Sequence, residues 1–545
     1  MINWLPHLPI LPVAVPLFAG AALLLLKDSQ RKTRVGLVLI SVLIQLAVAI
    51  KLLFVTAGSE PALWPQAIAV YLLGDWPAPF GIVMVVDRLA AIMLTLSAVL
   101  GLTTLVYSMA RWDRAGIHFH SLFQFLLMGL NGAFLTGDLF NLFVFFEVLL
   151  AASYGLMLHG SGEMRVSAGL HYIATNLIAS FMLLIAIALI YGVTGTLNMA
   201  DLAVQAGKLA GPDRKLFEAA AAILGMAFLI KAGAWPLNFW LPPAYANACA
   251  PVAAVFAIMT KVGIYALLRL GSLLLPTGAP AAFGGEWMFP VGLATLAFGT
   301  VGMLAAQQTD RLVGYCVIVS SGTLLAALGM PGVTLTGPAL FYLVSSVLAI
   351  GAFYMLIEMI ERTRSFGADV LAVSLEAFDL DDPESPDRSD DVVGVAIPAA
   401  MAFLGMAFIA CALLVAGLPP LSGFVAKFTL LSAALQTSTT DTPSIAAWLL
   451  VSAVLISGLA ALIALSRAGI RLFWSTEDSV TPRLRVSEAA PVGLLILSCI
   501  ALAIWAGPVS SYLNDAALSL DRPQSYIDAV LTKNPVRTLV PGNAQ

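Results

Sequence analysis

Charged residues are scarce in this chain of 545 residues, because Asp, Glu, Lys and Arg together make up only 11% of it. A soluble globular domain contains about 25% charged residues, so the composition excludes a soluble protein. Cysteine is also rare: the four cysteines stand singly in or next to apolar stretches, without the paired spacing of a disulfide framework or a metal site. We find no phosphate-binding loop and no nucleophile elbow, so a soluble-type enzyme is not supported.

Long apolar runs fill most of the remaining sequence. Hydrophobic residues make up 60% of the chain, and the mean hydropathy is +0.95. A run of about 18 apolar residues crosses a hydrocarbon core as a helix, and the alternating strands of a barrel are absent, so we predict an all-α integral membrane protein with about fourteen transmembrane helices. The predicted spans are residues 5–26, 35–56, 88–108, 119–137, 139–158, 166–192, 216–241, 249–270, 288–306, 311–330, 338–360, 393–417 with a continuation at 421–437, 446–466 and 488–512.

The loops differ in charge. Lys and Arg recur after every second predicted span, and the positive-inside rule then places both chain termini on the outer side. The segment EAFDLDDPESPDRSDD (376–391) carries eight acidic residues against one Arg. We predict that it is a solvated, flexible cytoplasmic connector, with a docking surface for a partner as the alternative.

Apart from the charges next to the loops, six ionisable residues lie inside the predicted spans, where each costs about 2.5 kcal/mol or more and therefore needs a reason. They are Lys51, Glu147, His171, Lys231, Lys261 and Lys427. Lys51 lies one turn from the end of its span and can reach the headgroups. His171 is either a hydrogen-bonding residue between helices or part of a proton relay. The pair His118 and His120 has no further ligands nearby, so we predict an interfacial feature and not a metal site.

Glu147 stands in the middle of its span, in GDLFNLFVFFEVLLAASYGL, beyond the reach of either surface. Buried intramembrane carboxylates usually mark ion or proton paths, so we predict a functional carboxylate, with a neutral structural Glu as the alternative. Asp138, at the start of the same span, is predicted to cap the helix. Lys261 is also central, and Tyr265 lies one turn further along the same face.

Two spans are interrupted by prolines beside a lysine. Lys231 precedes Pro236, Pro242 and Pro243 in LIKAGAWPLNFWLPPAYANACAP, and Lys427 follows the Pro-Pro pair of AGLPPLSGFVAKF. Proline removes a backbone donor and frees a carbonyl, and at membrane depth such a break survives only where it faces protein or water. The repetition predicts two inverted repeats with one discontinuous helix each, whose freed carbonyls and helix ends hydrate the two lysines.

These motifs resemble the antiporter-like membrane subunits shared by Mrp-type multisubunit cation/proton antiporters and respiratory complex I. Within that family, YLLGDWPAPFGIVMVVDRLAAIML (71–94) and ALFYLVSSVLAIGAFYMLIEMIERTR (339–364) are most similar to the D-type subunits of Mrp (Pha, Mnh) antiporters. The resemblance implies four parts. They are N-terminal helices at 1–118, a first inverted repeat at 119–270, a second at 288–473 with an acidic cytoplasmic loop at 365–392, and a last helix with an outer tail at 488–545.

The resemblance also implies a proton path. By motif position its members are the helix-5 Glu147, the helix-7 Lys231, the helix-8 Lys261, the helix-12 Lys427 and His171, which stands where many relatives have a lysine. Glu147 and Lys231 would form an ion pair that keeps the lysine charged. Some relatives carry histidines on helix 11 where this chain has Ser345 and Ser346, so water held by the serines would have to bridge Lys261 and Lys427.

The function implied is that of a proton-translocating subunit of a monovalent cation (Na⁺ or K⁺)/proton antiporter in a bacterial plasma membrane. Its partners would be the A, B, C, E, F and G types of Mrp subunit and membrane lipids, without a cofactor, a bound metal or nucleic acid. A proton-pumping subunit of complex I or of a membrane hydrogenase is the alternative, although Lys427 favours the antiporter because the complex I M-type subunit has Glu there. A passive scaffold is a further alternative, against which the buried charges argue.

Overall fold

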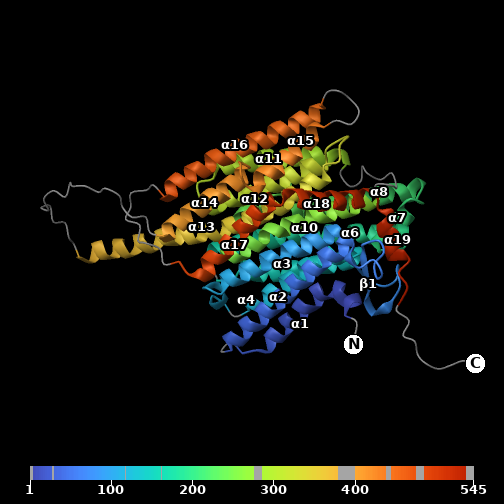
Figure 1. The fold of residues 1–545 in the computed structure, drawn as a ribbon, viewed down its shortest axis with the longest axis horizontal. Helices are drawn as coiled ribbons and strands as arrows, with labels where there is room; N and C mark the ends of the chain where they lie inside the picture. The colour runs from blue at the N-terminus through green and yellow to red at the C-terminus, as the bar shows by residue number, and fades with distance from the viewer. Residues whose placement is uncertain are drawn as a thin grey trace, which may run out of the picture.

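The computed structural model describes residues 4–27, 30–116, 118–160, 162–274, 285–378, 399–436, 443–473 and 484–535, which form a bundle of long helices (Figure 1). The helices are α1 Leu11–Leu25, α2 Arg31–Phe54, α3 Arg88–Ser108, α4 Phe119–Leu135, α5 Leu139–Met157, α6 Glu163–Thr194, α7 Met199–Ala206, α8 Gly211–Ala232, α9 Leu241–Asn247, α10 Ala250–Leu274, α11 Gly285–Ala305, α12 Thr309–Leu328, α13 Thr336–Phe378, α14 Ala399–Ala416, α15 Ser422–Leu435, α16 Ile445–Phe473, α17 Val486–Ile504, α18 Ala506–Asp521 and α19 Gln524–Leu531. A 3₁₀ turn, η1 (Leu5–Ile10), leads into α1.

Every predicted span overlaps a helix, although the span at 216–241 runs past the end of α8, the span at 488–512 covers α17 and part of α18, and residues 393–398 and 437 lie outside the described residues. Within the described residues, 12 helical segments are long and apolar enough to span a bilayer, and α4 and α15 are shorter apolar helices. In lipid, a helix satisfies its own backbone hydrogen bonds, so apolar runs of this length fold as helices. The prediction of an all-α, multi-pass membrane protein is confirmed, whereas the number of fourteen spans and the inverted repeats remain predictions.

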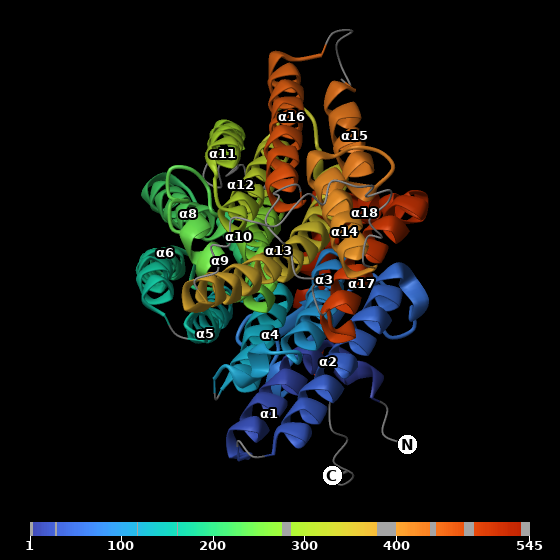
Figure 2. The ribbon, with the colours of Figure 1, turned by 90° about the vertical axis from the view of Figure 1, so that its left-hand side faces the viewer.

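Two helices form the centre of the bundle (Figure 2). In α10 and in the membrane-spanning part of α13, 89% of the residues in the most apolar 18-residue stretch are buried. The corresponding share is 33% in α14 and in α17. A helix that is apolar on all sides belongs in such a core. The four cysteines are buried and unpaired, which confirms their predicted role as small core residues: Cys249, Cys316, Cys411 and Cys499.

Both predicted helix breaks are present. Helix α8 ends at Gly233 and α14 ends at Gly417, each in the left-handed region, with φ of 72° and 79°. Glycine adopts this conformation without the steric cost that a Cβ would add. Pro242 and Pro243 then occupy the first turn of α9, where a missing N–H costs nothing.

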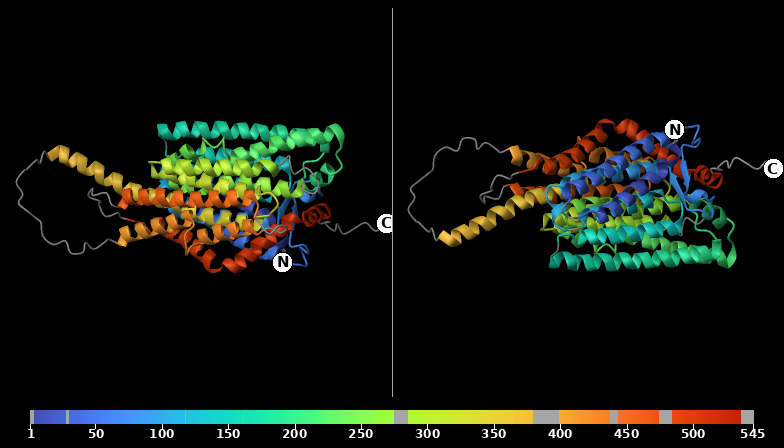
Figure 3. Two further views of the ribbon diagram at one scale, coloured as in Figure 1. Left: turned by 90° about the horizontal axis from the view of Figure 1, so that it is seen from above. Right: turned by 90° about the horizontal axis from the view of Figure 1, so that it is seen from below.

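The two ends of the bundle differ (Figure 3). Both termini lie at one end, beside an antiparallel hairpin of β1 (Ala69–Leu72) and β2 (Val83–Val86) that the sequence analysis did not predict. At the other end α13 projects beyond the neighbouring helices. It continues to Phe378, past its predicted end near residue 360, so the first part of the predicted loop 365–392 is helical. The acidic stretch from 379 onward lies outside the described residues.

Candidate functional site

Lys231 lies in the last turn of α8, directly before the first break, and its side chain is buried. Its ammonium donates a long hydrogen bond of 3.4 Å to Oγ of Ser180 on α6 and lies 4.7 Å from the centre of the Phe146 ring on α5. One hydroxyl and a cation–π contact are modest compensation for burying a charge. No other hydrogen bond to Nζ is formed within the described residues, so the ammonium retains donors for water.

Glu147 lies next to Phe146 on α5, and its Oε1 is buried without a hydrogen-bond partner in the described part of the chain. Its charge is near enough to act on Lys231, yet Lys231 makes its contacts with Ser180 and Phe146. The predicted direct ion pair between Glu147 and Lys231 is therefore not formed among the described residues, and the ammonium lies over the Phe146 ring instead. The predicted cap is confirmed, since Asp138 accepts a hydrogen bond of 2.9 Å from the backbone N–H of Asn141.

A small cavity of about 20 Å³ lies beside Lys231. Tyr172, Asn176, Trp240 and Tyr245 contribute polar groups to its wall, and Nε1 of Trp240 has no hydrogen-bond partner among the described residues. A space of this size can hold one water molecule where polar partners surround it. Trp240 and Tyr245 both follow the break in α8, so the break brings polar groups to the lysine.

Lys261 is fully buried in the middle of α10. Its ammonium donates to Oγ of Ser321 on α12 at 3.1 Å. Tyr265, one turn further along α10, donates to the backbone carbonyl of Phe134 at 2.6 Å, so its hydroxyl is held by α4 and forms no hydrogen bond with Lys261 among the described residues. Ser321 is therefore the direct partner of this lysine, and the sequence analysis did not single it out.

Lys427 lies on α15, just after the second break. Its ammonium donates to the carbonyl oxygens of Val415 and Ala416, at 3.0 and 2.9 Å. These carbonyls belong to the last turn of α14, which Gly417 ends, so no further helical N–H reaches them. The carbonyls freed by the second break therefore bind Lys427 directly, whereas Lys231 beside the first break contacts a hydroxyl; the predicted hydration of the two lysines stays a prediction.

Five serines lie between Lys261 and Lys427 on three adjacent helices. Ser320 on α12 donates to Ser346 on α13 at 3.0 Å, and Ser345 on α13 shares a 2.8 Å hydrogen bond with Ser422 on α15. Ser321, which binds Lys261, belongs to the same set. Serine hydroxyls therefore lie at the contacts of α12 with α10, of α12 with α13, and of α13 with α15. We call these five residues the serine ladder. Its only visible sign in the sequence is the Ser-Ser pair that α12 and α13 each contain.

His171 is the one predicted path residue that lies apart from the buried groups. Its side chain is exposed on α6, and Nδ1 is 3.0 Å from the carbonyl oxygen of Ser167, one turn earlier in the same helix. Neither a hydrogen bond between helices nor a link to the lysines is formed by this side chain within the described residues. The other four predicted residues face the interior of the bundle.

The remaining ionisable residues have local partners. Lys51 forms a 2.8 Å ion pair with Glu60 just beyond the end of α2, in keeping with its predicted place near the membrane surface. His120 is buried at the start of α4, with Nε2 3.8 Å from Oδ2 of Asp113. His118 precedes α4 and makes no capping hydrogen bond. No group of three potential metal ligands occurs in the described ranges.

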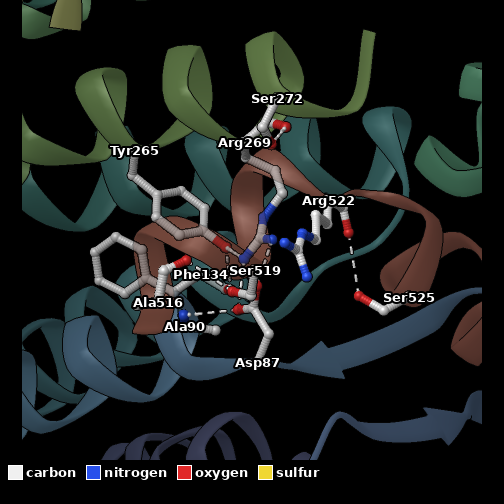
Figure 4. A network of polar contacts seen from close by, with 10 residues as sticks. All are labelled: Asp87, Ala90, Phe134, Tyr265, Arg269, Ser272, Ala516, Ser519, Arg522 and Ser525. Atoms are coloured by element: carbon white, nitrogen blue, oxygen red, sulfur yellow. Dashed lines mark hydrogen bonds and ion pairs between the residues drawn. The ribbon is translucent and has the colours of Figure 1, made fainter. Parts of the chain in front are cut away.

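A buried ion pair joins α10 to the start of α3 (Figure 4). Arg269 on α10 binds Asp87, the cap of α3, with two hydrogen bonds of 2.6 Å, and also donates to the hydroxyl of Tyr265 at 3.2 Å. Asp87 accepts a further hydrogen bond from the backbone of Ala90. This two-point geometry favours a stable pair, which joins α3 and α10. The sequence analysis did not single out either residue.

Comparison with known proteins agrees with this architecture. Residues 136–457 match the family described as "NADH:quinone oxidoreductase/Mrp antiporter, TM". The chain is 52% identical to the D-type subunit of a probable K⁺/H⁺ antiporter from Rhizobium meliloti, over 98% of this chain and 99% of that protein, and 30% identical to the D-type subunit of a Na⁺/H⁺ antiporter from Bacillus subtilis, over 96% and 99%. A chain in the structure of the Mrp complex from Dietzia sp. DQ12-45-1b superposes with a TM-score of 0.76 at 27% identity, covering 96% of this chain and 99% of that one. The chain therefore belongs to the NADH:quinone oxidoreductase/Mrp antiporter transmembrane family.

Proposed function

We propose that this chain is the proton-translocating D-type subunit of a multisubunit monovalent cation/proton antiporter in a bacterial plasma membrane. The names of two relatives that match almost the whole chain, both of them D-type antiporter subunits, support the assembly and the class of transport. The other subunits would be of the A, B, C, E, F and G types. The single observation that supports the proton path is the serine ladder, whose hydrogen bonds join Lys261 to α12, α12 to α13, and α13 to Ser422 on α15, the helix that carries Lys427.

Each lysine would alternate between an ammonium and a neutral amine. Only the ammonium can give up a proton, and only the amine can accept one. A serine hydroxyl both donates and accepts, so it can take a proton on a lone pair while its own proton moves on. Water would complete the steps between neighbouring serines of one helix, where the hydroxyls do not contact each other.

Glu147 would act on Lys231 through space. A nearby carboxylate favours the ammonium, and a change in their separation would release a proton toward Lys261. The membrane potential would drive the transfer, at about 2.3 kcal/mol per charge per 100 mV. The two broken helices would each serve one of two inverted repeats, at 119–270 and 288–473, so that the two halves of the path work alike.

The alternative is a proton-pumping subunit of complex I or of a related hydrogenase, since the family model spans both groups. The 52% identity over nearly the full length of an antiporter subunit favours exchange over redox-driven pumping. Lys427 supports the same choice.

The proposal can be tested with inside-out vesicles from a bacterial strain without antiporters of its own that expresses the whole assembly. Addition of Na⁺ or K⁺ to respiring vesicles should collapse the pH gradient, reported by a fluorescent dye. Vesicles with Ser108→Ala, which alters a buried serine bonded only to its own helix, serve as the control. Equal gradient collapse with and without this chain would refute the proposal.

A further inference from the structure

A cavity of about 740 Å³ opens near the end of the bundle from which α13 projects. Its lining residues belong to α6, α9, α10, α12 and α13 and to the segment before α4. Two acidic side chains, Asp310 in the first turn of α12 and Glu361 on α13, line this cavity and also a neighbouring one of about 560 Å³. Both carboxyl groups are therefore reached by solvent from two spaces.

The carboxyl groups of Asp310 and Glu361 interact directly with each other. Neither one forms an ion pair with a basic residue in the described ranges. Glu358, one turn before Glu361, is different because it accepts hydrogen bonds of 2.9 and 3.0 Å from the indole of Trp112 and lies 4.0 Å from Arg362. Asp310 and Glu361 are thus two carboxyls that have each other as partners.

Two carboxylates in contact repel each other, and a shared proton relieves the repulsion. The other charged groups around the two cavities are Arg111 before α4, Glu163 and Arg165 on α6, Arg311 on α12, Arg362 on α13 and Arg471 on α16. Arg362 is engaged by Glu488 of α17 at 2.7 Å, and Arg165 by the backbone carbonyls of His159 and Asn247. None of these arginines forms an ion pair with Asp310 or Glu361 in the described ranges, so a shared proton remains to balance the two carboxylates.

A third group in the same cavity is ready to bind water or a proton carrier. The hydroxyl of Tyr354 on α13 is buried, with 3% of the residue exposed, and has no hydrogen-bond partner in the described part of the chain. Its ring lies 6.3 Å from that of Tyr245, which lines both this cavity and the small cavity beside Lys231. Polar groups therefore continue from the carboxyl pair to the first lysine of the path.

We propose that Asp310 and Glu361 form a proton-holding carboxyl pair, the port through which Lys231 exchanges protons with the aqueous phase at this end of the protein. A proton leaves Nζ of Lys231, passes along water and the Tyr354 hydroxyl, and binds a carboxylate oxygen of the pair, which releases it to solvent. Only N–H and O–H bonds are exchanged, and the reverse order is equally allowed. The positive-inside rule assigns this end to the cytoplasm. The role of the pair as a port for Lys231 rests on the proposed antiporter function. The proton shared by Asp310 and Glu361 does not depend on that function.

Infrared spectroscopy of the purified full-length chain tests the shared proton without any transport. A protonated carboxyl group has a carbonyl stretching band separate from that of a carboxylate, and the wild-type protein should show it at neutral pH. In the difference spectrum between variant and wild type, Asp310→Asn and Glu361→Gln should each show the loss of one such band. The remaining carboxyl group no longer has a carboxylate that repels its charge, so it ionises. Glu163→Gln, which removes an exposed carboxylate at the cavity rim, should not. Spectra without a lost band in either pair variant overturn the proposal, and if one variant fails to fold the other decides.

Transport by the whole assembly tests the port. Asp310→Asn, Glu361→Gln and Tyr354→Phe should each slow cation-driven proton flux about tenfold or more, as expected for loss of a proton-transfer group, whereas Glu163→Gln should not. Unchanged flux in both pair variants overturns the port. If the wild-type assembly exchanges no cation for protons but the infrared band is lost as described, the carboxyl pair stands and the antiporter function fails.

Discussion

Ser345 and Ser422 offer a direct test of the serine ladder, because their hydroxyls form its hydrogen bond between α13 and α15. Both side chains are buried, at 2% and 0% exposure, and the two oxygens are 2.8 Å apart. We consider the double variant Ser345→Ala/Ser422→Ala, which puts two methyl groups where the hydroxyls meet. A proton would then have no acceptor at this helix contact.

The size of the effect follows from the geometry. A single change leaves one buried hydroxyl without its partner and should lower the free energy of unfolding by about 1–3 kcal/mol. The double change removes both partners and should be nearly neutral for stability. Proton transport should nevertheless fall about a hundredfold in the double variant, the lower end of the contribution of a positioned proton-transfer group. The single variants should therefore lose more stability than the double variant, whereas the double variant should show the large loss of transport.

The assay measures cation-induced collapse of the pH gradient in vesicles, together with thermal unfolding of the purified assembly, for both single variants and the double variant. Ser108→Ala is the matched control, because this buried serine donates to a carbonyl of its own helix and lies outside the ladder. Transport by the double variant within a factor of about three of wild type would show that protons do not cross between α13 and α15 at this point.

Glu147→Ala and Lys231→Ala should each abolish cation/proton exchange while the assembly remains intact; vesicles of either variant that respond normally to Na⁺ or K⁺ would remove that residue from the path. Lys427→Ala should block transport, and Lys427→Arg should fail nearly as badly because arginine does not release its proton; full transport with arginine would mean that a fixed charge is enough. Asp87→Asn leaves the buried Arg269 without its charged partner and should lower the free energy of unfolding by about 3–5 kcal/mol, measured as a lower Tm; an unchanged Tm would show that the Asp87–Arg269 ion pair does not stabilise the fold. The purified chain alone should exchange no Na⁺ or K⁺ for protons in liposomes, since lysines beside both breaks repel a cation, and robust flux would make it a self-sufficient antiporter.

Local patterns were enough to predict the helices and their breaks. Apolar runs predicted the long helices, because burial in lipid depends on the composition of the segment itself. Gly233 and Gly417 end their helices next to prolines, and these effects act within a few residues of the chain. The capping of α5 by Asp138 is of the same kind. Burial of Lys231, Lys261 and Lys427 also followed from their central place in apolar runs.

Contacts between helices depend on how each helix is rotated and which neighbour it meets, and the sequence by itself did not determine either. Hydropathy alone could not show that Phe146 lies against Lys231 or that His171 faces outward, because every side of a membrane helix can be apolar. The serine ladder and the contact of Asp310 with Glu361 join residues of different helices. The sequence determined a membrane-spanning helical chain with buried charges at two breaks, while tertiary packing decided which polar groups those charges meet.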